Sequence, residues 1–364
     1  MANLHVVVGG QTGSEAKGHV TGWLAKSPHV GAVVRVAGPN AGHTAYQDGV
    51  GFALRQIPCA AVTNRDCRLV IAAGSEIDPD VLYGEINQLE AAGIPVRDRL
   101  WVDPEATVIT DDHKQAEAKL TGRIGSTAKG IGAARSDRLM RTAMTWEEWY
   151  KSLPRDGDMD DMSINMVPTT PMLYSAFSSD KDVIIEGTQG FGLGLHAGEY
   201  PYCTSSDCRA IDFLAMTGLS PWAPNIELQV WPVFRTYPIR VAGNSGPMYR
   251  ELTWEELATR TNGYIKPERT TVTKKIRRIG EWDATLAYRA MVANGWPSDR
   301  IHPVLTFVDY VFPELADTDD RGVLDHHEGL WPFLQRIETD LGTMNHPARL
   351  AAFTTGPDTL VPLR

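Results

Sequence analysis

Glycine-rich segments that carry lysine, histidine or hydroxyl side chains recur along the chain. The first, GGQTGSEAKG at Gly9–Gly18, follows an expected strand and opens an expected helix. Glycines let the backbone approach a phosphate closely, and a helix N-terminus offers free N–H groups and a positive dipole end. Lys17 adds a charge, although a strict P-loop ends in Gly-Lys-Ser/Thr. The segment predicts a phosphate site, with a simple glycine-rich turn as the alternative.

Two further loops carry groups suited to phosphate chemistry. VAGPNAGHT, residues 36–44, places Asn40, His43 and Thr44 just beyond an expected strand. A loop histidine can supply a proton or hydrogen bond to a phosphate or oxyanion. GRIGSTAKGIG, residues 122–132, offers the hydroxyls of Ser126 and Thr127. Taken alone, the first loop is more typical of a satisfied turn histidine, and the second loop is as typical of a flexible surface loop as of a phosphate site.

The second half of the chain adds an amide and a basic cluster. EGTQGFGLG, residues 186–194, carries Gln189, whose amide can bind a base edge, and EYPYCTSSD, residues 199–207, adds the hydroxyl of Thr204. ERTTVTKKIRRIGEWD, residues 268–283, interleaves hydroxyls with cations. Because arginine pairs with carboxylates in a bidentate way, this stretch favours a dicarboxylate or polyphosphate. The alternatives are an ordinary strand end with a turn and a solvated basic face.

Short β-branched runs alternate with helical patterns, which predicts an α/β fold with a large, mostly parallel central sheet flanked by helices. Ligands of such sheets bind where loops leave the carboxyl ends of strands, and the glycine-rich segments fall there. The expected strands are 4–8, 31–36, 69–72, 183–185, 226–234, 304–308 and 349–354, and the expected helices are 17–26 and 79–92.

Composition excludes several classes of protein. With 43% apolar and 22% charged residues over 364 positions, the chain has an ordinary globular composition. A net charge of −10 makes it a poor nucleic-acid binder. No apolar run approaches the ~20 residues of a membrane span, and the N-terminus lacks a secretion signal. We expect a cytosolic protein with reduced cysteines, located in the host cytoplasm if the chain is viral. We expect residues 155–162 to form an acidic loop and the HHE run at 326–328 to lie on the surface.

Together and in this order, the motifs resemble adenylosuccinate synthetase. GQTGSEAKG resembles the family's first loop, Gly-x-x-Gly-Asp-Glu-Gly-Lys-Gly, and NAGHT matches outright. GSTAKGIG, EGTQG and YPYCTSS resemble later motifs, and TTGPD at 354–358 matches near the C-terminus. The resemblance covers Leu4 to Asp358. It implies the P-loop-like adenylosuccinate synthetase fold, as a single domain over residues 1–364.

The family couples L-aspartate to the 6-position of a purine nucleotide, using GTP and Mg²⁺. A phosphoryl group is placed on O6 and is then displaced by the amine of aspartate. By resemblance, Ser14, Lys17, His43 and Gln189 occupy catalytic positions, and Ser14 and the Gly42 carbonyl occupy the Mg²⁺ site. The implied purine-nucleotide site comprises Asn40, Ser126, Thr127, Arg141, Gln189 and Thr204. The implied triphosphate site comprises Gly13, Glu15, Ala16, Lys17, Gly18, Gly42, His43, Thr44, Phe307, Asp309, Gly356 and Pro357.

Two further roles follow from the resemblance. The stretch 273–278 is similar to the family's aspartate loop, which implies that Thr273, Lys275 and Arg277 bind aspartate. Lys275 replaces a family arginine and lacks its bidentate fork. Arg141 is similar to the arginine that the family sends across a homodimer interface to the neighbour's substrate phosphate.

Ser14 replaces the family's catalytic aspartate, which takes the N1 proton of the purine and helps to hold Mg²⁺. The same replacement is a feature of a viral branch that acts on dGMP. Guanine carries a 2-amino group beside N1, and a small neutral residue leaves room for it. A carboxylate would instead bind N1–H and the 2-amino group together, which stabilises the bound substrate without aiding phosphoryl transfer. Glu15, a metal-bound water and the phosphate itself remain alternatives for removing the N1 proton.

Phe307 replaces the lysine of the family's Thr-Lys-x-Asp motif, which recognises the guanine of GTP. An aromatic ring stacks on any base, so the sequence predicts ATP or dATP as the phosphoryl donor. Three interpretations follow: a dGMP–aspartate ligase that makes N6-succino-2-amino-2′-deoxyadenylate for 2-aminoadenine DNA, an adenylosuccinate synthetase that uses IMP, and a non-catalytic purine-nucleotide-binding paralogue. We favour the first, because it accounts for both Ser14 and Phe307. Its partners are small molecules, with no nucleic acid and no membrane.

Overall fold

A ten-stranded sheet forms the centre of the computed structural model, which describes residues 1–154, 163–270 and 274–363. Every neighbouring pair is parallel except β16 and β17. This confirms the expected α/β class. In spatial order the strands are β17 (Leu360–Pro362), β16 (Ala352–Thr354), β15 (Val304–Thr306), β11 (Ile226–Arg235), β1 (Ala2–Gly9), β10 (Asp182–Glu186), β2 (Val30–Arg35), β5 (Arg68–Ile71), β7 (Leu100–Val102) and β9 (Asn165–Met166).

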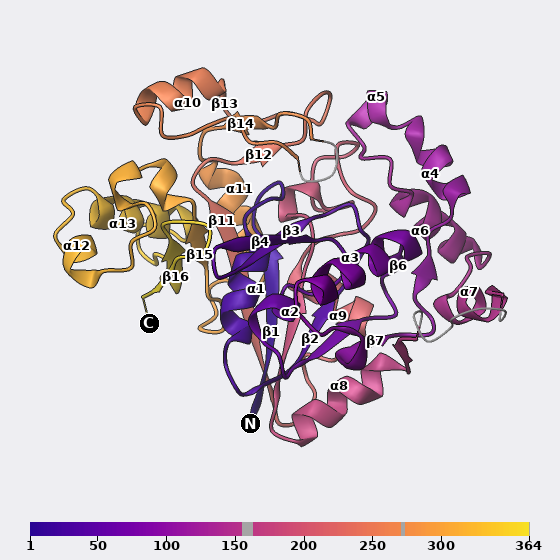
Figure 1. The fold of residues 1–364 in the computed structure, drawn as a ribbon. Helices are drawn as coiled ribbons and strands as arrows, with labels where there is room; N and C mark the ends of the chain where they lie inside the picture. The colour runs from indigo at the N-terminus through magenta and orange to yellow at the C-terminus, as the bar shows by residue number, and fades with distance from the viewer. Residues whose placement is uncertain (155–162, 271–273, 364) are drawn as a thin grey trace.

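Helices cover both faces of this sheet because its central strands are apolar on both sides (Figure 1). In β1, Leu4, Val6 and Val8 point into one core, whereas Val7 points into the other. The first core is closed by α8 (Thr169–Ser178), α9 (Ala210–Thr217), α11 (Ala284–Ala293) and α13 (Leu330–Leu341), and the second by α1 (Lys17–Ala25), α2 (Ala60–Thr63), α3 (Pro79–Ala91) and α7 (Trp146–Ser152).

Smaller elements surround the upper end of the sheet in Figure 1. The small sheet β12–β14–β13 and the neighbouring helix lie at the top of that view, and the N-terminus lies at the bottom. These elements are β12 (Ile239–Arg240), β14 (Arg278–Gly280), β13 (Glu251–Leu252), α10 (Trp254–Arg260), the hairpin β3 (His43–Gln47) and β4 (Val50–Leu54), the pair β6 (Glu76–Ile77) and β8 (Thr107–Val108), and the helices α4 (Asp111–Ala118), α5 (Thr121–Ile124), α6 (Ile131–Met140) and α12 (Arg321–Asp325).

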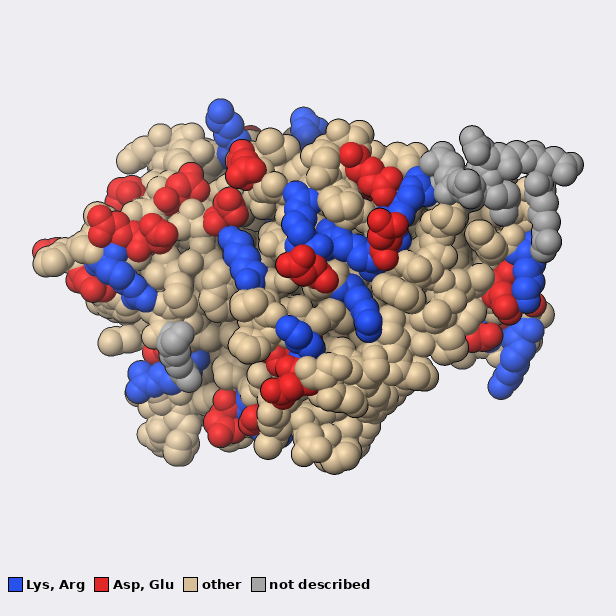
Figure 2. All heavy atoms as spheres, turned by 60° about the horizontal axis from the view of Figure 1, so that its bottom comes forward, with Lys and Arg blue, Asp and Glu red and all other residues tan. Residues whose placement is uncertain are grey.

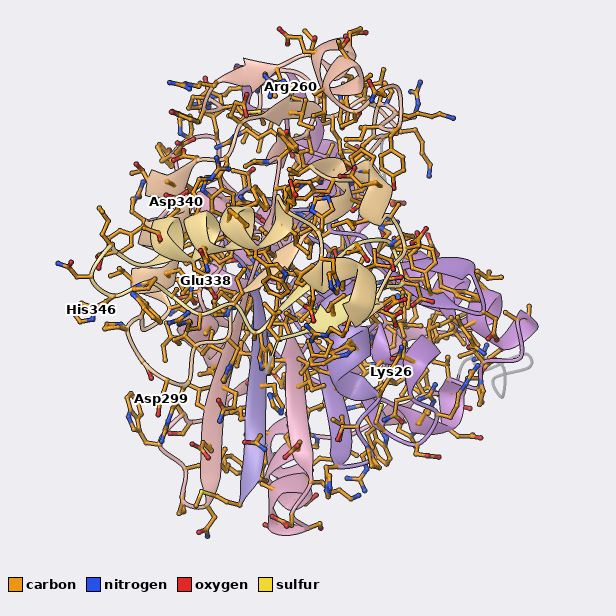
Figure 3. The ribbon with its side chains drawn as sticks, turned by 90° about the vertical axis from the view of Figure 1, so that its left-hand side faces the viewer. Lys26, Arg260, Asp299, Glu338, Asp340 and His346 are labelled. Atoms are coloured by element: carbon orange, nitrogen blue, oxygen red, sulfur yellow. The ribbon has the colours of Figure 1, made fainter. Side chains whose placement is uncertain are left out.

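The direction of α1 shows which end of the sheet carries the site. In Figure 3, Lys26, the residue after α1, lies low beside the strands, whereas Arg260, the last residue of α10, lies at the top. Helix α1 therefore begins at the carboxyl ends of the strands, where Lys17 stands. This is the end at which open parallel sheets bind their ligands.

Two expected strands are shorter than predicted. Strand β15 ends at Thr306, not at 308, because Phe307 adopts a left-handed φ of 61° and the chain turns into a 3-10 helix, Val308–Tyr310. Strand β16 begins at Ala352, not at 349, since its pairing with β15 starts there. All four cysteines are free, as expected, and the acidic segment 155–162 lies outside the described residues.

Among the described residues, charges of both signs are distributed over the lower face of the molecule. Figure 2 brings this face forward and shows basic and acidic side chains side by side. Within residues 1–154, 163–270 and 274–363, no helix has the length and apolar character needed to span a bilayer.

Candidate active site

The first glycine-rich loop is fastened from inside by Glu15, whose side chain is fully buried. Its Oε1 accepts hydrogen bonds from the backbone N–H groups of Gln11 (3.2 Å) and Gly13 (2.7 Å). Its Oε2 lies 2.7 Å from Nζ of Lys17. Through these three contacts, Glu15 shapes the loop and holds Lys17 in place.

The EGTQG loop packs directly against this first loop. A Cβ on Gly190 would lie 2.5 Å from Oε1 of Glu15 and 2.6 Å from the Gln11 carbonyl, so only glycine allows the contact. Lys17 Nζ also donates to the carbonyl of Gln189. This lysine therefore joins the two loops that the sequence placed in the same site.

His43, at the start of β3, is set by two buried groups on neighbouring strands. Its Nδ1 lies 2.5 Å from Oε1 of Glu186, and Nη1 of Arg35 lies 2.6 Å from the same oxygen. Burial and the charge of Arg35 lower the pKa of His43 to about 3. Burial alone would raise the pKa of Glu186, but Arg35 and the hydrogen bond from His43 lower it to about 2. A neutral His43 thus donates from Nδ1 to an ionised Glu186, which leaves Nε2 for a ligand.

A cavity of about 320 Å³, here called the acceptor cavity, brings together most of the predicted purine-nucleotide site. Asn40, Ser126, Thr127, Gln189 and Thr204 all line it. Several further lining residues were not predicted from the sequence. Some of them lie within the glycine-rich or hydroxyl-rich segments described above, which was the only sequence feature that could have pointed to them. The residues not predicted include Thr12, Glu117, Arg123, Tyr200, Tyr202 and Arg240.

A second cavity of about 400 Å³, here called the donor cavity, brings together most of the predicted triphosphate site. Gly13 and Glu15 lie outside its lining and support it from behind. Tyr46, Tyr310 and Thr354 were missed; His19 was missed too, although it directly follows the motif. The predicted residues in its wall are Ser14, Ala16, Lys17, Gly18, Gly42, His43, Thr44, Phe307, Asp309, Gly356 and Pro357.

The first loop separates the two cavities. Thr12 lines the acceptor cavity, whereas Ser14 and Lys17 line the donor cavity. Ser14 is exposed with a φ of 60°, and its carbonyl accepts a hydrogen bond from Nη1 of Arg235 at 3.2 Å. Within the part of the chain that the structure describes, no hydrogen bond engages its hydroxyl. Two nucleotide-sized sites therefore meet at a loop that carries a lysine and a free hydroxyl.

The basic stretch is only partly assembled at the site. Arg277 lines the donor cavity, and its Nη1 lies 2.8 Å from Oε2 of Glu268. Lys275 is exposed and lines neither cavity, while Thr273 lies outside the described residues. Arg141 is exposed at the end of α6 and does not line the acceptor cavity of its own chain.

The donor cavity has oxygen groups that could help to hold Mg²⁺ together with a bound nucleotide. Mg²⁺ is usually held by one or two carboxylates together with substrate phosphates. The Glu15 carboxylate is already bound to Lys17 and two backbone N–H groups, and the carboxylate of Asp309 lies beside Phe307, so the first two glycine-rich loops offer the neutral oxygens of Ser14 and Gly42. These residues fit a Mg²⁺ ion whose anionic ligands are the phosphates of a nucleotide.

The parallel sheet, the phosphate-type loop and the paired cavities define an α/β nucleotide-binding enzyme. A family model described as Adenylosuccinate synthetase matches residues 6–155 and 156–302. Adenylosuccinate synthetase from Methanococcus maripaludis (strain C5) is 33% identical over 360 residues, which are 97% of this chain and 96% of the relative. The enzyme from Pyrococcus horikoshii is 35% identical over 360 residues with the same coverage of 97% and 96%.

Solved structures show the same fold. The cyanophage S-2L succinoaminodeoxyadenylate synthetase (PurZ), bound to dGMP and to dATP as an energy donor, matches with a TM-score of 0.78 and 27% identity, covering 100% of this chain and 95% of that chain. Fully ligated adenylosuccinate synthetase from Plasmodium falciparum matches with a TM-score of 0.78 and 20% identity, with 100% of both chains covered. The chain belongs to the adenylosuccinate synthetase family and is a carbon–nitrogen ligase.

Proposed function

We propose that this ligase joins L-aspartate to C6 of dGMP, with ATP or dATP as the phosphoryl donor, to give N6-succino-2-amino-2′-deoxyadenylate. The observation that carries the proposal is Ser14, a small neutral residue at the position where the family motif has aspartate; it lines the donor cavity and lies on the loop that separates the two cavities. A guanine 2-amino group needs space beside N1, and serine leaves it. The likeness to the cyanophage enzyme bound to dGMP and dATP supports this assignment.

The residues divide the reaction between them. Lys17 and His43 face the donor cavity, where their polar atoms can stabilise the γ-phosphoryl group as it moves to O6 of the acceptor. The amine of aspartate then displaces phosphate from C6. Ser14 and Gly42 would hold Mg²⁺, the family's cofactor, which would neutralise charge on the triphosphate. The acceptor nucleotide is held by Asn40, Ser126, Thr127, Gln189 and Thr204. Lys275 and Arg277 are assigned to aspartate on their resemblance to the family's aspartate loop alone.

We also propose a homodimer in which Arg141 completes the partner's acceptor site. Arg141 is exposed, and its neighbours Leu139 and Met140 are 74% and 70% exposed. Exposed apolar side chains beside an exposed arginine that lines neither cavity of its own chain are typical of an interaction surface. Arg123 and Arg240 of the same chain line the acceptor cavity, and Arg141 of the partner would add a third cation for the substrate phosphate.

A substrate matrix tests the function. The purified protein is incubated with L-aspartate, Mg²⁺ and either dGMP or IMP, each with ATP or GTP, and products are identified by mass. We expect a succino adduct from dGMP with ATP, and none from Lys17→Met. A product from IMP with GTP alone would establish an ordinary adenylosuccinate synthetase. Nucleotide binding by calorimetry without any turnover would establish the non-catalytic paralogue instead.

A further inference from the structure

The far end of the donor cavity is built around Phe307, which is held in an unusual backbone conformation. Its φ of 61° is costly for a bulky residue, roughly 1–3 kcal/mol. Two threonines hold the backbone in place: Thr236 Oγ1 donates to the Phe307 carbonyl at 2.7 Å, and the Phe307 N–H donates to Thr354 Oγ1 at 3.1 Å. The ring is therefore fixed where it lines the cavity.

Arg235 covers one side of this ring. Its guanidinium carbon lies 4.0 Å from the ring centroid, and the Tyr310 ring packs edge-on at 5.0 Å. Arg235 is in turn held by Glu268, 2.5 Å from its Nη2. The Phe307 ring thus offers a rigid stacking surface for a base. Stacking is tolerant of base identity, so Phe307 by itself does not distinguish adenine from guanine.

Asp309 is the polar group beside this stacking surface, and one of its oxygens is already engaged. The Tyr264 hydroxyl donates to Asp309 Oδ2 at 3.0 Å. Asp309 is only 6% exposed but lines the donor cavity. Tyr264 follows α10, where its N–H donates to the Thr261 carbonyl at 2.9 Å, and it does not line the cavity itself. Its influence on a ligand therefore passes through Asp309.

The two purines make different demands on such a carboxyl group. Guanine presents two adjacent donors, N1–H and the 2-amino group, which match a carboxylate with both oxygens free. Adenine presents one donor, its 6-amino group, beside the acceptor N1. When Tyr264 takes one lone pair of Oδ2, the other oxygen still meets the demand of adenine, but one of the two guanine donors is paired more weakly. Weak pairing of a polar group in a buried site is costly.

We propose that Tyr264 is a specificity-determining residue for the phosphoryl donor: by donating to Oδ2 of Asp309 it leaves Oδ1 as the stronger acceptor, which fits the 6-amino group of adenine and disfavours guanine. This inference rests on the proposed function only in taking the donor cavity as the triphosphate site. The choice between ATP and GTP at Asp309 is separate from base stacking on Phe307 and from the choice between dGMP and IMP in the acceptor cavity.

The test measures binding of ATP and GTP by calorimetry in the presence of Mg²⁺, without dGMP or aspartate. In Tyr264→Phe we expect GTP to gain ~10-fold relative to ATP. Tyr288→Phe, at an exposed tyrosine on α11, is the matched control and should leave the ratio unchanged. The proposal is overturned if the ratio in Tyr264→Phe stays within about twofold of the wild-type ratio, or if the wild-type protein prefers GTP.

A second variant checks the route through Asp309. In Asp309→Asn, an amide replaces the carboxyl group, so Tyr264→Phe added to it should no longer change the ATP to GTP ratio. A full shift in that background would show that Tyr264 acts elsewhere and would overturn the proposal. Because no acceptor is present, failure of dGMP in the substrate matrix leaves this result intact. Conversely, if the ratio of ATP to GTP binding is unchanged in Tyr264→Phe, the proposal for Tyr264 fails even where the dGMP reaction is confirmed.

Discussion

Oε1 of Glu186 lies 2.5 Å from Nδ1 of His43, although the two residues are 143 positions apart in the sequence. Arg35 donates to the same oxygen at 2.6 Å, and the N–H of Cys59 donates to Oε2 at 2.8 Å. The carboxylate therefore orients the imidazole and is itself neutralised by a guanidinium. This arrangement fixes which nitrogen of His43 faces the donor cavity.

Replacing Glu186 by Gln should lower kcat by roughly 10²-fold, because an amide N–H₂ group would oppose the donors on His43 and Arg35. KM for the donor should change far less, since Lys17 and the backbone of the first loop remain. Steady-state kinetics measures both values, and circular dichroism checks folding. The exposed Glu328→Gln serves as control. A kcat within threefold of wild type, about 0.7 kcal/mol, would show that His43 needs no such support.

A second paired carboxylate, that of the half-buried Glu268, predicts how stability depends on pH. Burial alone would raise the pKa of Glu268, but the charges of Arg235 and Arg277 lower it to about 2. The ionised group therefore contributes stability above its unfolded pKa of about 4.5, and this contribution is lost as pH falls towards 2.

Glu268→Gln should accordingly reduce the free energy of unfolding at pH 7 by ~2–3 kcal/mol, and the gap to wild type should narrow between pH 5 and about 3. Urea unfolding at a series of pH values measures the gap. Glu328→Gln controls for the loss of one surface charge. A gap that stays constant down to about pH 3 would rule out this role for Glu268.

Local patterns predicted the parts of the site that lie next to each other in the chain. The apolar β-branched run of β1, followed by glycines and Lys17, indicated both the strand and the helix that begins at Lys17. Tyr310 was missed although it directly follows the motif that ends at Asp309, and Arg240 was missed because β12 carries no motif. The left-handed Phe307 has no local signal either, since it depends on Thr236 and Thr354 from distant strand ends.

Ser14 predicts a switch of acceptor. In Ser14→Asp, a carboxylate should take the N1 proton of IMP but crowd the 2-amino group of dGMP, so the ratio of kcat/KM for IMP to that for dGMP should rise ~10²-fold. Ser178→Asp adds the same charge to an exposed position on α8 and should leave the ratio unchanged. If Ser14→Asp loses both activities equally, space beside N1 is not the reason for serine at this position.

Arg141 predicts activity shared between two chains. If its guanidinium binds the partner's substrate phosphate, Arg141→Leu and Lys17→Met are each inactive as homodimers, but a hybrid dimer holds one intact site, with Lys17 from one chain and Arg141 from the other. An equal mixture that exchanges subunits freely should therefore recover about a quarter of wild-type activity. The measurement is the dGMP-dependent rate before and after mixing, with each variant alone as control. No recovery, despite subunit exchange shown by differently tagged chains, would place Arg141 in the site of its own chain or outside catalysis altogether.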